Sequence, residues 1–147
     1  MDIKGAYLNG TLKETIYMWQ PNGYEDDTNH VCKLIKTLYG LKQSGHKWNT
    51  EFDNKIKKHR FKCLRSEPYA YTQSENNKIV IITIWVDDLL LFANSAEAME
   101  RIKRDIHNEW KVTDLGKPTK IVGVEINQIP DQISISQKQN ILKIPNK

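Results

Sequence analysis

The stretch that most constrains the fold of this 147-residue chain is IVIITIWVDDLLLFA, residues 79–93. Two adjacent aspartates, Asp87 and Asp88, interrupt an apolar run that is rich in β-branched residues. Side chains along a strand alternate between the two faces of a sheet, and a tight turn lets both acids project from its tip. The pattern therefore predicts a hairpin of two apolar strands with a pair of carboxylates at the turn.

Carboxylates that lie together in apolar surroundings repel each other unless something neutralises them. A divalent cation does so, and hard oxygen ligands suit Mg²⁺. A site for two ions needs a further anchor, for which Asp2 is the candidate. The residue types alone leave two alternatives open. Asp87 and Asp88 form an exposed turn, or Asp2 is a frayed terminal charge.

Hydrophobic periodicity predicts a mixture of helices and strands along the rest of the chain. Helices are expected over 44–58, 96–110 and 136–144, with Ser44 capping the first and Asn94 or Ser95 the second. Strands are expected over 16–20, 31–35, 69–73, 78–85, 89–93, 120–127 and 132–136. The elements alternate without βαβ regularity, which favours an α+β fold. We expect an antiparallel sheet with helices packed on one face, plus a C-terminal hairpin.

Charge and composition narrow the classes of partner. The net charge is +4, and the segment 31–65 holds ten Lys and Arg against two acids. Such a segment contacts a polyanion or forms a solvated helix face. No apolar run approaches the roughly 20 residues of a membrane span. The two cysteines, Cys32 and Cys63, form no CxxC pair. An intracellular protein with no membrane partner is expected.

Five short blocks, in this order, resemble the reverse transcriptase domain of copia-type LTR retrotransposons. The blocks are DIKGAYLNG at 2–10, IYMWQPNGY at 16–24, LYGLKQS at 38–44, WVDD at 85–88 and KIVGVEI at 120–126. Trp85 stands where the family usually has Tyr, and His46 where an Arg is common. The resemblance implies an RNA-directed DNA polymerase with a palm-like sheet.

The resemblance also implies roles for individual residues. The catalytic, metal-binding acids would be Asp2, Asp87 and Asp88, which hold two Mg²⁺ ions, or Mn²⁺, together with the main-chain oxygen of Ile3. Tyr7 would exclude ribonucleotides by steric clash, and Gln43 would contact the incoming nucleotide or template base. Nucleic-acid contacts are expected at Lys42, Lys47, Lys55 and Gly123. Without the resemblance, Tyr7 reads as a core residue and Gln43 as a polar residue at a helix start.

The implied partners are an RNA or DNA template with its primer, deoxynucleoside triphosphates and the rest of a retroelement polyprotein. The parent element would act in a cytoplasmic virus-like particle or in the nucleus. Residues 1–147 are expected to be a partial domain without the N-terminal fingers and the thumb, and not to extend a primer alone.

Two alternatives to the polymerase stay open. The first is a catalytically inactive nucleic-acid-binding remnant of a retroelement. The second is a Mg²⁺-dependent phosphatase or nuclease that uses Asp87 and Asp88 on an unrelated fold. The ordered family blocks and Tyr7 disfavour the second.

Overall fold

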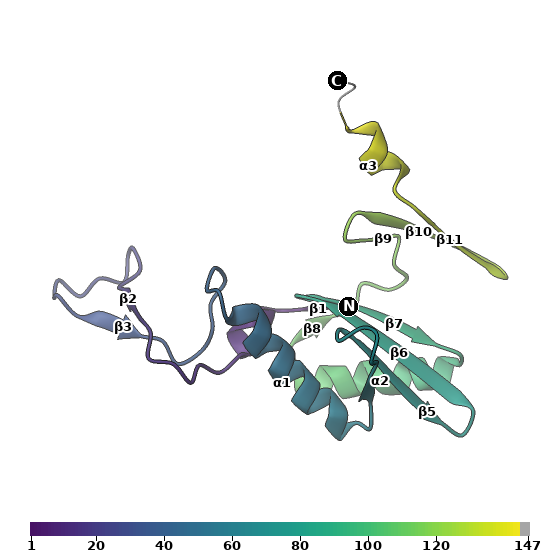
Figure 1. Ribbon diagram of the computed structural model, residues 1–147, viewed down its shortest axis with the longest axis horizontal. Coiled ribbons are helices and arrows are strands. Elements are labelled where there is room, and N and C mark those ends of the chain that lie inside the picture. Colours follow the sequence, from purple (N-terminus) through teal and green to yellow (C-terminus); the bar gives the residue numbers. More distant parts are fainter. Residues whose placement is uncertain (145–147) are drawn as a thin grey trace.

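A six-stranded antiparallel sheet forms the centre of the molecule (Figure 1). The structure is a computed structural model, and it describes residues 1–144. In spatial order the strands are β4 (Lys62–Cys63), β5 (Ala70–Glu75), β6 (Lys78–Trp85), β7 (Asp88–Ala93), β1 (Asp2–Ile3) and β8 (Val112–Thr113). The strand nearest the N-terminus therefore lies between two strands that come more than 80 residues later.

The longest strand, β6, shows how the sequence builds this sheet. Val80, Ile82 and Ile84 alternate along it and are buried, whereas Trp85 at its end is exposed. Every second residue of a strand points to the same face, so one face of β6 belongs to the core. The turn before β6 contains Asn76 and Asn77, both at positive φ, a geometry that asparagine tolerates and that suits a two-residue hairpin.

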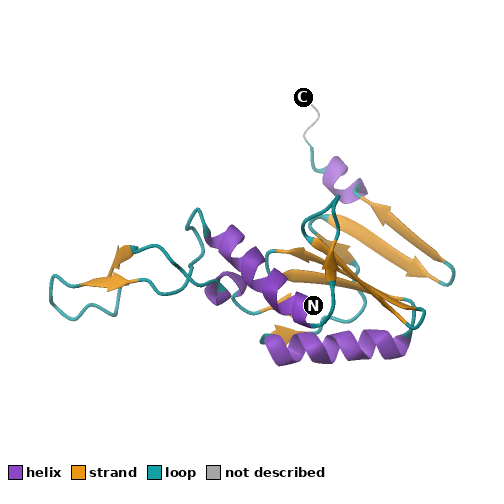
Figure 2. Ribbon diagram, turned by 60° about the horizontal axis from the view of Figure 1, so that its bottom comes forward, coloured by secondary structure: helices purple, strands orange, loops and turns teal. Residues whose placement is uncertain are grey.

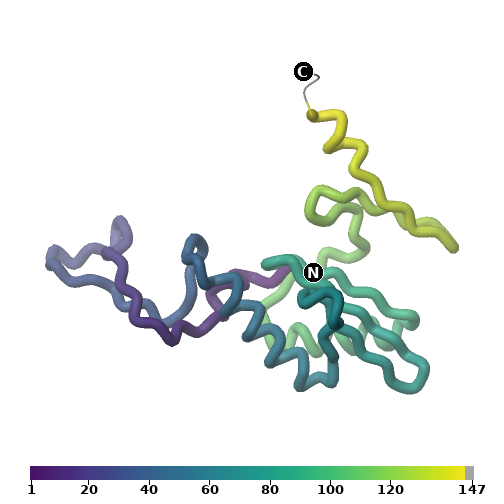
Figure 3. The backbone as a smooth tube through the Cα atoms, viewed as in Figure 1, coloured from purple at the N-terminus to yellow at the C-terminus, as the bar shows by residue number. Residues whose placement is uncertain are grey.

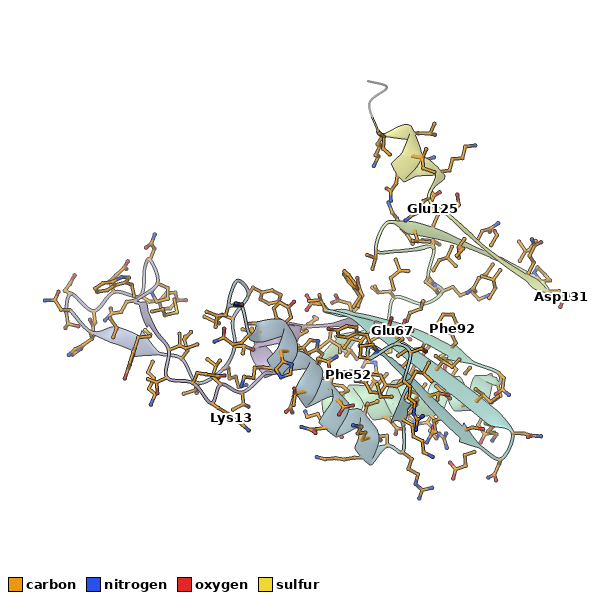
Figure 4. All side chains as sticks on the ribbon, viewed as in Figure 1. Lys13, Phe52, Glu67, Phe92, Glu125 and Asp131 are labelled. Carbon is orange, nitrogen blue, oxygen red and sulfur yellow. The ribbon has the colours of Figure 1, made fainter. Side chains whose placement is uncertain are left out.

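Two helices cover the buried face of the sheet, on the side opposite to the C-terminal strands (Figure 2). They are α1 (Ser44–Lys58) and α2 (Ala96–Glu109). Their apolar residues recur every four positions and are buried at Trp48, Phe52 and Ile56 and at Ala98, Ile102 and Ile106. Phe52 lies in the layer of side chains under α1 (Figure 4), and its ring stacks on that of Trp110 with centroids 5.0 Å apart.

Two further β units lie outside this core, at opposite ends of the molecule (Figure 3). The strands β2 (Tyr17–Trp19) and β3 (Val31–Lys33) form a projecting two-stranded hairpin. It follows a short 3-10 helix, η1 (Ala6–Asn9). At the other end a three-stranded sheet precedes the short helix α3 (Lys138–Leu142). Its strands are β9 (Lys120–Ile121), β10 (Val124–Ile129) and β11 (Gln132–Ser136).

The α+β class, the antiparallel sheet and the C-terminal hairpin are confirmed, but several details differ from expectation. The strand expected over 120–127 is broken by a turn in which Val122 and Gly123 both have positive φ. Ser44 does not cap α1; its hydroxyl donates to the carbonyl of Leu38 instead. The helix expected over 136–144 is confined to α3.

One expected cap is confirmed. The Ser95 hydroxyl accepts a hydrogen bond from the amide of Ala98 at 3.2 Å, in the first turn of α2. Among the described residues, no helix combines the length and apolarity that a membrane span requires.

Candidate functional site at the acidic turn

The two aspartates of the apolar run lie at the tight turn between β6 and β7. Trp85 pairs with Asp88, so Val86 and Asp87 are the two residues of the turn itself. Val86 has φ 54°, an uncommon conformation for a β-branched residue. Such strain costs on the order of 1–3 kcal/mol and persists only where the surroundings impose it. The indole Nε1–H of buried Trp48 donates to the Val86 carbonyl at 2.8 Å and so contributes to holding this turn.

The third acid, Asp2, reaches the turn because β1 pairs along β7. Asp2 lies directly opposite Asp88 in the register, and the amide of Ile3 donates to the carbonyl of Asp87 at 2.8 Å. The amino group of Met1 donates to the Leu89 carbonyl at 2.8 Å, and the Leu89 amide donates back to Met1. The alternative of a frayed terminal charge at Asp2 is therefore wrong.

The register also fixes the side on which the acids lie. Residues directly opposite in an antiparallel pair project from the same face, with Cβ atoms about 4.5–5.5 Å apart. The carboxylates of Asp2 and Asp88 therefore share one face of the sheet. The expected closeness of Asp2 is confirmed for Asp88 only, because the described residues hold no cluster of three such acids. The catalytic roles of these acids stay predictions.

Asp87 has a partner that the sequence did not indicate. The hydroxyl of Tyr39 donates to both of its carboxylate oxygens, at 2.8 and 2.9 Å. Partial burial, followed by this hydrogen bond and the charge of Asp87, raises the pKa of Tyr39 to about 12. Tyr39 is thus a neutral hydrogen-bond donor at physiological pH, and it covers the carboxylate at the tip of the turn.

Tyr7 lies beside this contact. Its ring packs against the ring of Tyr39, with centroids 4.8 Å apart and planes inclined by 41°. Tyr7 belongs to η1, which begins after Gly5 in the left-handed conformation at φ 61°. A Cβ on Gly45, at the start of α1, would lie 3.6 Å from the Tyr7 hydroxyl. Two tyrosines and the start of α1 therefore border the acidic turn.

The donor chemistry of this site fits a hard divalent cation, because three carboxylates and nearby backbone oxygens are the ligands that Mg²⁺ and Mn²⁺ prefer. The three carboxylates are, however, not gathered around one point. Within residues 1–144, no group of three or more His, Cys, Asp or Glu side chains is gathered so that it could hold a metal ion. Both oxygens of Asp87 are engaged by Tyr39 instead.

The residues predicted to contact nucleic acid differ in exposure and in whether an acidic side chain lies beside them. Lys42 is exposed and Gln43 half-buried in the residues that lead into α1. Lys47 forms an ion pair with Glu14 at 3.0 Å. Lys55 lies near two acids, with Glu51 and Glu109 oxygens each 3.7 Å away, and 5.2 Å from the centre of the Trp110 ring.

Gly123 lies apart from the lysines of the α1 region. It occupies the turn between β9 and β10, and its carbonyl accepts a hydrogen bond from the side chain of Asn140 at 3.0 Å. A groove of about 1110 Å³ extends from Asp88 along β7 to Lys120 and Ile121 of the neighbouring β9. The turn of Gly123 therefore adjoins a strand that lines the same groove as Asp88.

The chain belongs to the reverse transcriptase family. A family model described as reverse transcriptase (RNA-dependent DNA polymerase) matches residues 1–147. No solved structure matches the chain. The resemblance to copia-type retrotransposons is confirmed, because the curated relatives below are proteins of such elements.

Three relatives illustrate this relationship. The chain is 35% identical to the retrovirus-related Pol polyprotein from transposon TNT 1-94 of Nicotiana tabacum, covering 98% of the chain and 11% of the polyprotein. A transposon Ty5-1 protein of Saccharomyces cerevisiae is also 35% identical, with 97% of the chain and 47% of that protein covered. The Pol polyprotein from transposon RE1 of Arabidopsis thaliana is 31% identical, over 98% of the chain and 10% of the polyprotein. The chain thus spans from a tenth to half the length of these relatives.

Two contributors to the site escaped the sequence analysis. Tyr39 lies inside the block 38–44, but no local pattern indicates a hydrogen bond to a residue 48 positions away. The sequence pattern indicates only that Trp48 is a core residue of α1. A buried indole N–H usually has a hydrogen-bond partner, and here that partner is the Val86 carbonyl.

Proposed function

We propose that this chain forms the palm part of a reverse transcriptase active site, which transfers deoxynucleotides to the 3′ end of a primer. The observation that carries the proposal is the pairing of Asp2 with Asp88 beside the turn of Asp87, in a chain of this family. The six-stranded sheet with α1 and α2 on one face would be the palm.

In this proposal the three carboxylates hold two divalent cations, Mg²⁺ or Mn²⁺, with the backbone oxygen of Ile3 as a further ligand. The bound ions would activate the primer 3′ hydroxyl as a nucleophile and stabilise the negative charge on the departing pyrophosphate. The rigid β1–β7 pairing fixes Asp2 and Asp88 relative to each other, and Trp48 fixes the turn that carries Asp87. Such preorganisation is what an in-line transfer requires.

Residues around the acids would position the nucleotide. Tyr7, half-buried in η1, offers a rigid aromatic ring that would clash with a 2′-hydroxyl group. Gln43 at the start of α1 would contact the incoming nucleotide or the template base, and Lys42 the phosphate backbone. Template, primer and deoxynucleoside triphosphates are the partners that follow.

Metal binding by the 147-residue chain tests the proposal. The free Mn²⁺ signal in electron paramagnetic resonance should fall on titration, and Mg²⁺ should compete. Asp2→Asn and Asp88→Asn should each weaken Mn²⁺ binding by on the order of tenfold or more, because each removes a ligand charge. The matched control is Asp131→Asn, at the tip of the hairpin β10–β11 (Figure 4). Equal affinities in all three variants would contradict the proposed site.

The same titration addresses the alternative of a catalytically inactive remnant. The engagement of Asp87 by Tyr39 is the observation in its favour. A remnant that only binds nucleic acid would do so without any dependence on Asp2 or on Mn²⁺.

A further inference from the structure

We infer that Tyr39 is a latch on Asp87, which a divalent cation must displace before the acidic site can bind it fully. The inference rests on the proposed function, because it concerns the same three carboxylates. It starts from the bifurcated hydrogen bond that the Tyr39 hydroxyl donates to Asp87, with the two carboxylate oxygens 2.8 and 2.9 Å away.

The hydroxyl competes with a cation because of where it lies. An ionised carboxylate accepts through two oxygens with about four lone-pair directions, and a donor placed between the oxygens takes the side from which a cation binds both. Hydrogen bonds to an ionised acceptor are also stronger than those between neutral groups. Tyr39 therefore stabilises the form of Asp87 that has no metal bound.

The backbone around Tyr39 allows the latch to open without movement of α1. On one side Thr37 is fully buried, its amide donates to the Gly10 carbonyl at 2.9 Å, and its hydroxyl donates to the Tyr7 carbonyl. On the other side Ser44 is fully buried at the start of α1. Between these anchors Gly40 has φ 96° with open space around it. Gly40, which has the backbone freedom of a glycine, directly follows Tyr39.

Release of the Tyr39 hydroxyl from Asp87 would cost little free energy. The side chain is 50% exposed, so its hydroxyl exchanges the carboxylate for water when it leaves. Hydrogen bonds to charged groups are worth about 1.5–3 kcal/mol net, but exposure to water reduces this one toward the roughly 0.5–1.5 kcal/mol of an ordinary hydrogen bond. That range corresponds to about a two- to tenfold change in affinity. The latch is thus strong enough to hold Asp87 and weak enough for a cation to displace.

The contact also joins two functions of the proposed site. The ring of Tyr39 packs on Tyr7, the proposed barrier to ribonucleotides, while its hydroxyl holds Asp87. Displacement by a cation would change the environment of both tyrosine rings at once. Metal binding would then be visible in the near-ultraviolet absorbance of tyrosine.

The test compares Mn²⁺ affinity, measured by electron paramagnetic resonance, in the wild-type chain, Tyr39→Phe and Tyr69→Phe. Tyr69 is the matched control because it is 49% exposed, close to the 50% of Tyr39. Tyr39→Phe keeps the ring and removes only the donor, so it should bind Mn²⁺ about two- to tenfold more tightly. Tyr69→Phe should bind like the wild type. An unchanged or weaker affinity in Tyr39→Phe would overturn the latch.

A second readout separates the latch from a general effect on structure. Mg²⁺ should produce a tyrosine difference spectrum in the wild type and in Tyr69→Phe, and a much smaller one in Tyr39→Phe. Equal spectra in all three proteins would overturn the inference. The variant Asp2→Asn keeps the two claims distinct. Binding that requires Asp2 but ignores Tyr39 contradicts the latch alone, whereas binding that ignores Asp2 contradicts the proposed site.

Discussion

At the scale of single residues, the acidic turn depends on a side chain that carries no charge. Trp48 lies 2% exposed in α1, and its indole donates to the carbonyl of strained Val86. Removal of the indole donor leaves a partly buried acceptor without its partner, which costs up to about 1–3 kcal/mol. We predict that Trp48→Phe lowers the free energy of unfolding by about 1–3 kcal/mol, measured by urea denaturation. Much of the aromatic packing on Phe52 would remain.

The control for this prediction is Trp19→Phe. Trp19 is 76% exposed on β2, and surface substitutions of this kind usually change stability by less than about 0.5 kcal/mol. If Trp48→Phe and Trp19→Phe unfold at the same urea concentration, the hydrogen bond to Val86 contributes nothing to stability.

Residues of the site differ in how well the sequence predicts them. Asp87 and Asp88 stand out because their apolar frame is local. Asp2 was one open candidate until the family resemblance supported it, because its pairing with Asp88 joins positions 86 residues apart. The bond from Tyr39 to Asp87 is equally remote and carries no family motif that points to it. Local patterns therefore predict which residues are unusual, but not which of them meet.

At the scale of elements, α1 and α2 are joined by a polar contact at the edge of their packed faces. The His59 Nε2 lies 3.1 Å from an oxygen of Glu109, and its Nδ1 is 3.7 Å from Asp105. Glu109 also lies near Lys55. The hydrogen bond with His59, together with the charge of Lys55, outweighs the opposing effect of burial and holds the pKa of the Glu109 carboxyl below its ordinary value of 4.5.

This lowered pKa predicts a dependence of stability on pH. A carboxyl whose pKa is lower in the folded state stabilises the fold above its unfolded pKa and loses that contribution as the pH falls through the folded pKa. We predict that Glu109→Gln is less stable than the wild type by about 0.5–1 kcal/mol at pH 7. The difference should shrink below about pH 4.5 in urea titrations. Glu100→Gln, with a 64% exposed side chain, should show no such trend.

The projecting hairpin β2–β3 is the second element with a specific expectation. Thr11 and Lys36 face each other in an isolated β-bridge at its base. An Asn-Gly turn in place of residues 12–35 would therefore close without strain. Because β2 and β3 add no side chain to the central core, we predict a melting temperature within about 4 °C of the wild type. A fall of more than about 10 °C, followed by circular dichroism, would show that the hairpin stabilises the central sheet.

Periodicity predicted the longer elements and missed the two-residue strands of the central sheet, for a physical reason. A strand of six or eight residues, such as β5 or β6, displays its alternation, and α1 displays its four-residue repeat. The strands β1, β4 and β8 have two residues each, too few to show any period. These residues are strands because they pair with neighbouring strands of the sheet, which only the folded structure shows.

At the scale of the whole molecule, the chain is a compact core with two extended arms, and it spans a tenth of the TNT 1-94 and RE1 polyproteins. The arms carry exposed apolar residues, including Trp19 on β2 and Ile133 and Ile135 on β11. Single exposed residues are ordinary, but a row of them along an arm is typical of a surface that other parts of a larger protein cover. That this chain alone does not extend a primer stays a prediction.

The charge of the molecule gives the last prediction. Of the ten basic residues in 31–65, several already form ion pairs, among them Lys47 with Glu14, Lys55 with Glu109 and Lys57 with Asp53. Within the described residues, Lys42 forms no ion pair, and it is exposed just before α1. Its charge is therefore available to phosphate, whereas that of Lys55 is largely compensated.

Binding of a primer–template duplex, measured by fluorescence anisotropy between 50 and 200 mM salt, distinguishes these lysines. Each phosphate contact contributes about 0.9 to the slope of log affinity against log salt. We predict that Lys42→Ala lowers this slope by about one contact and weakens binding at low salt, because it removes a charge that no acid offsets. Lys55→Ala should leave the slope unchanged, since the lysine lies between Glu51 and Glu109. A larger loss of slope in Lys55→Ala than in Lys42→Ala would show that the ion pairs of α1 open when nucleic acid binds, and that the basic helix face rather than the loop before it contacts phosphate.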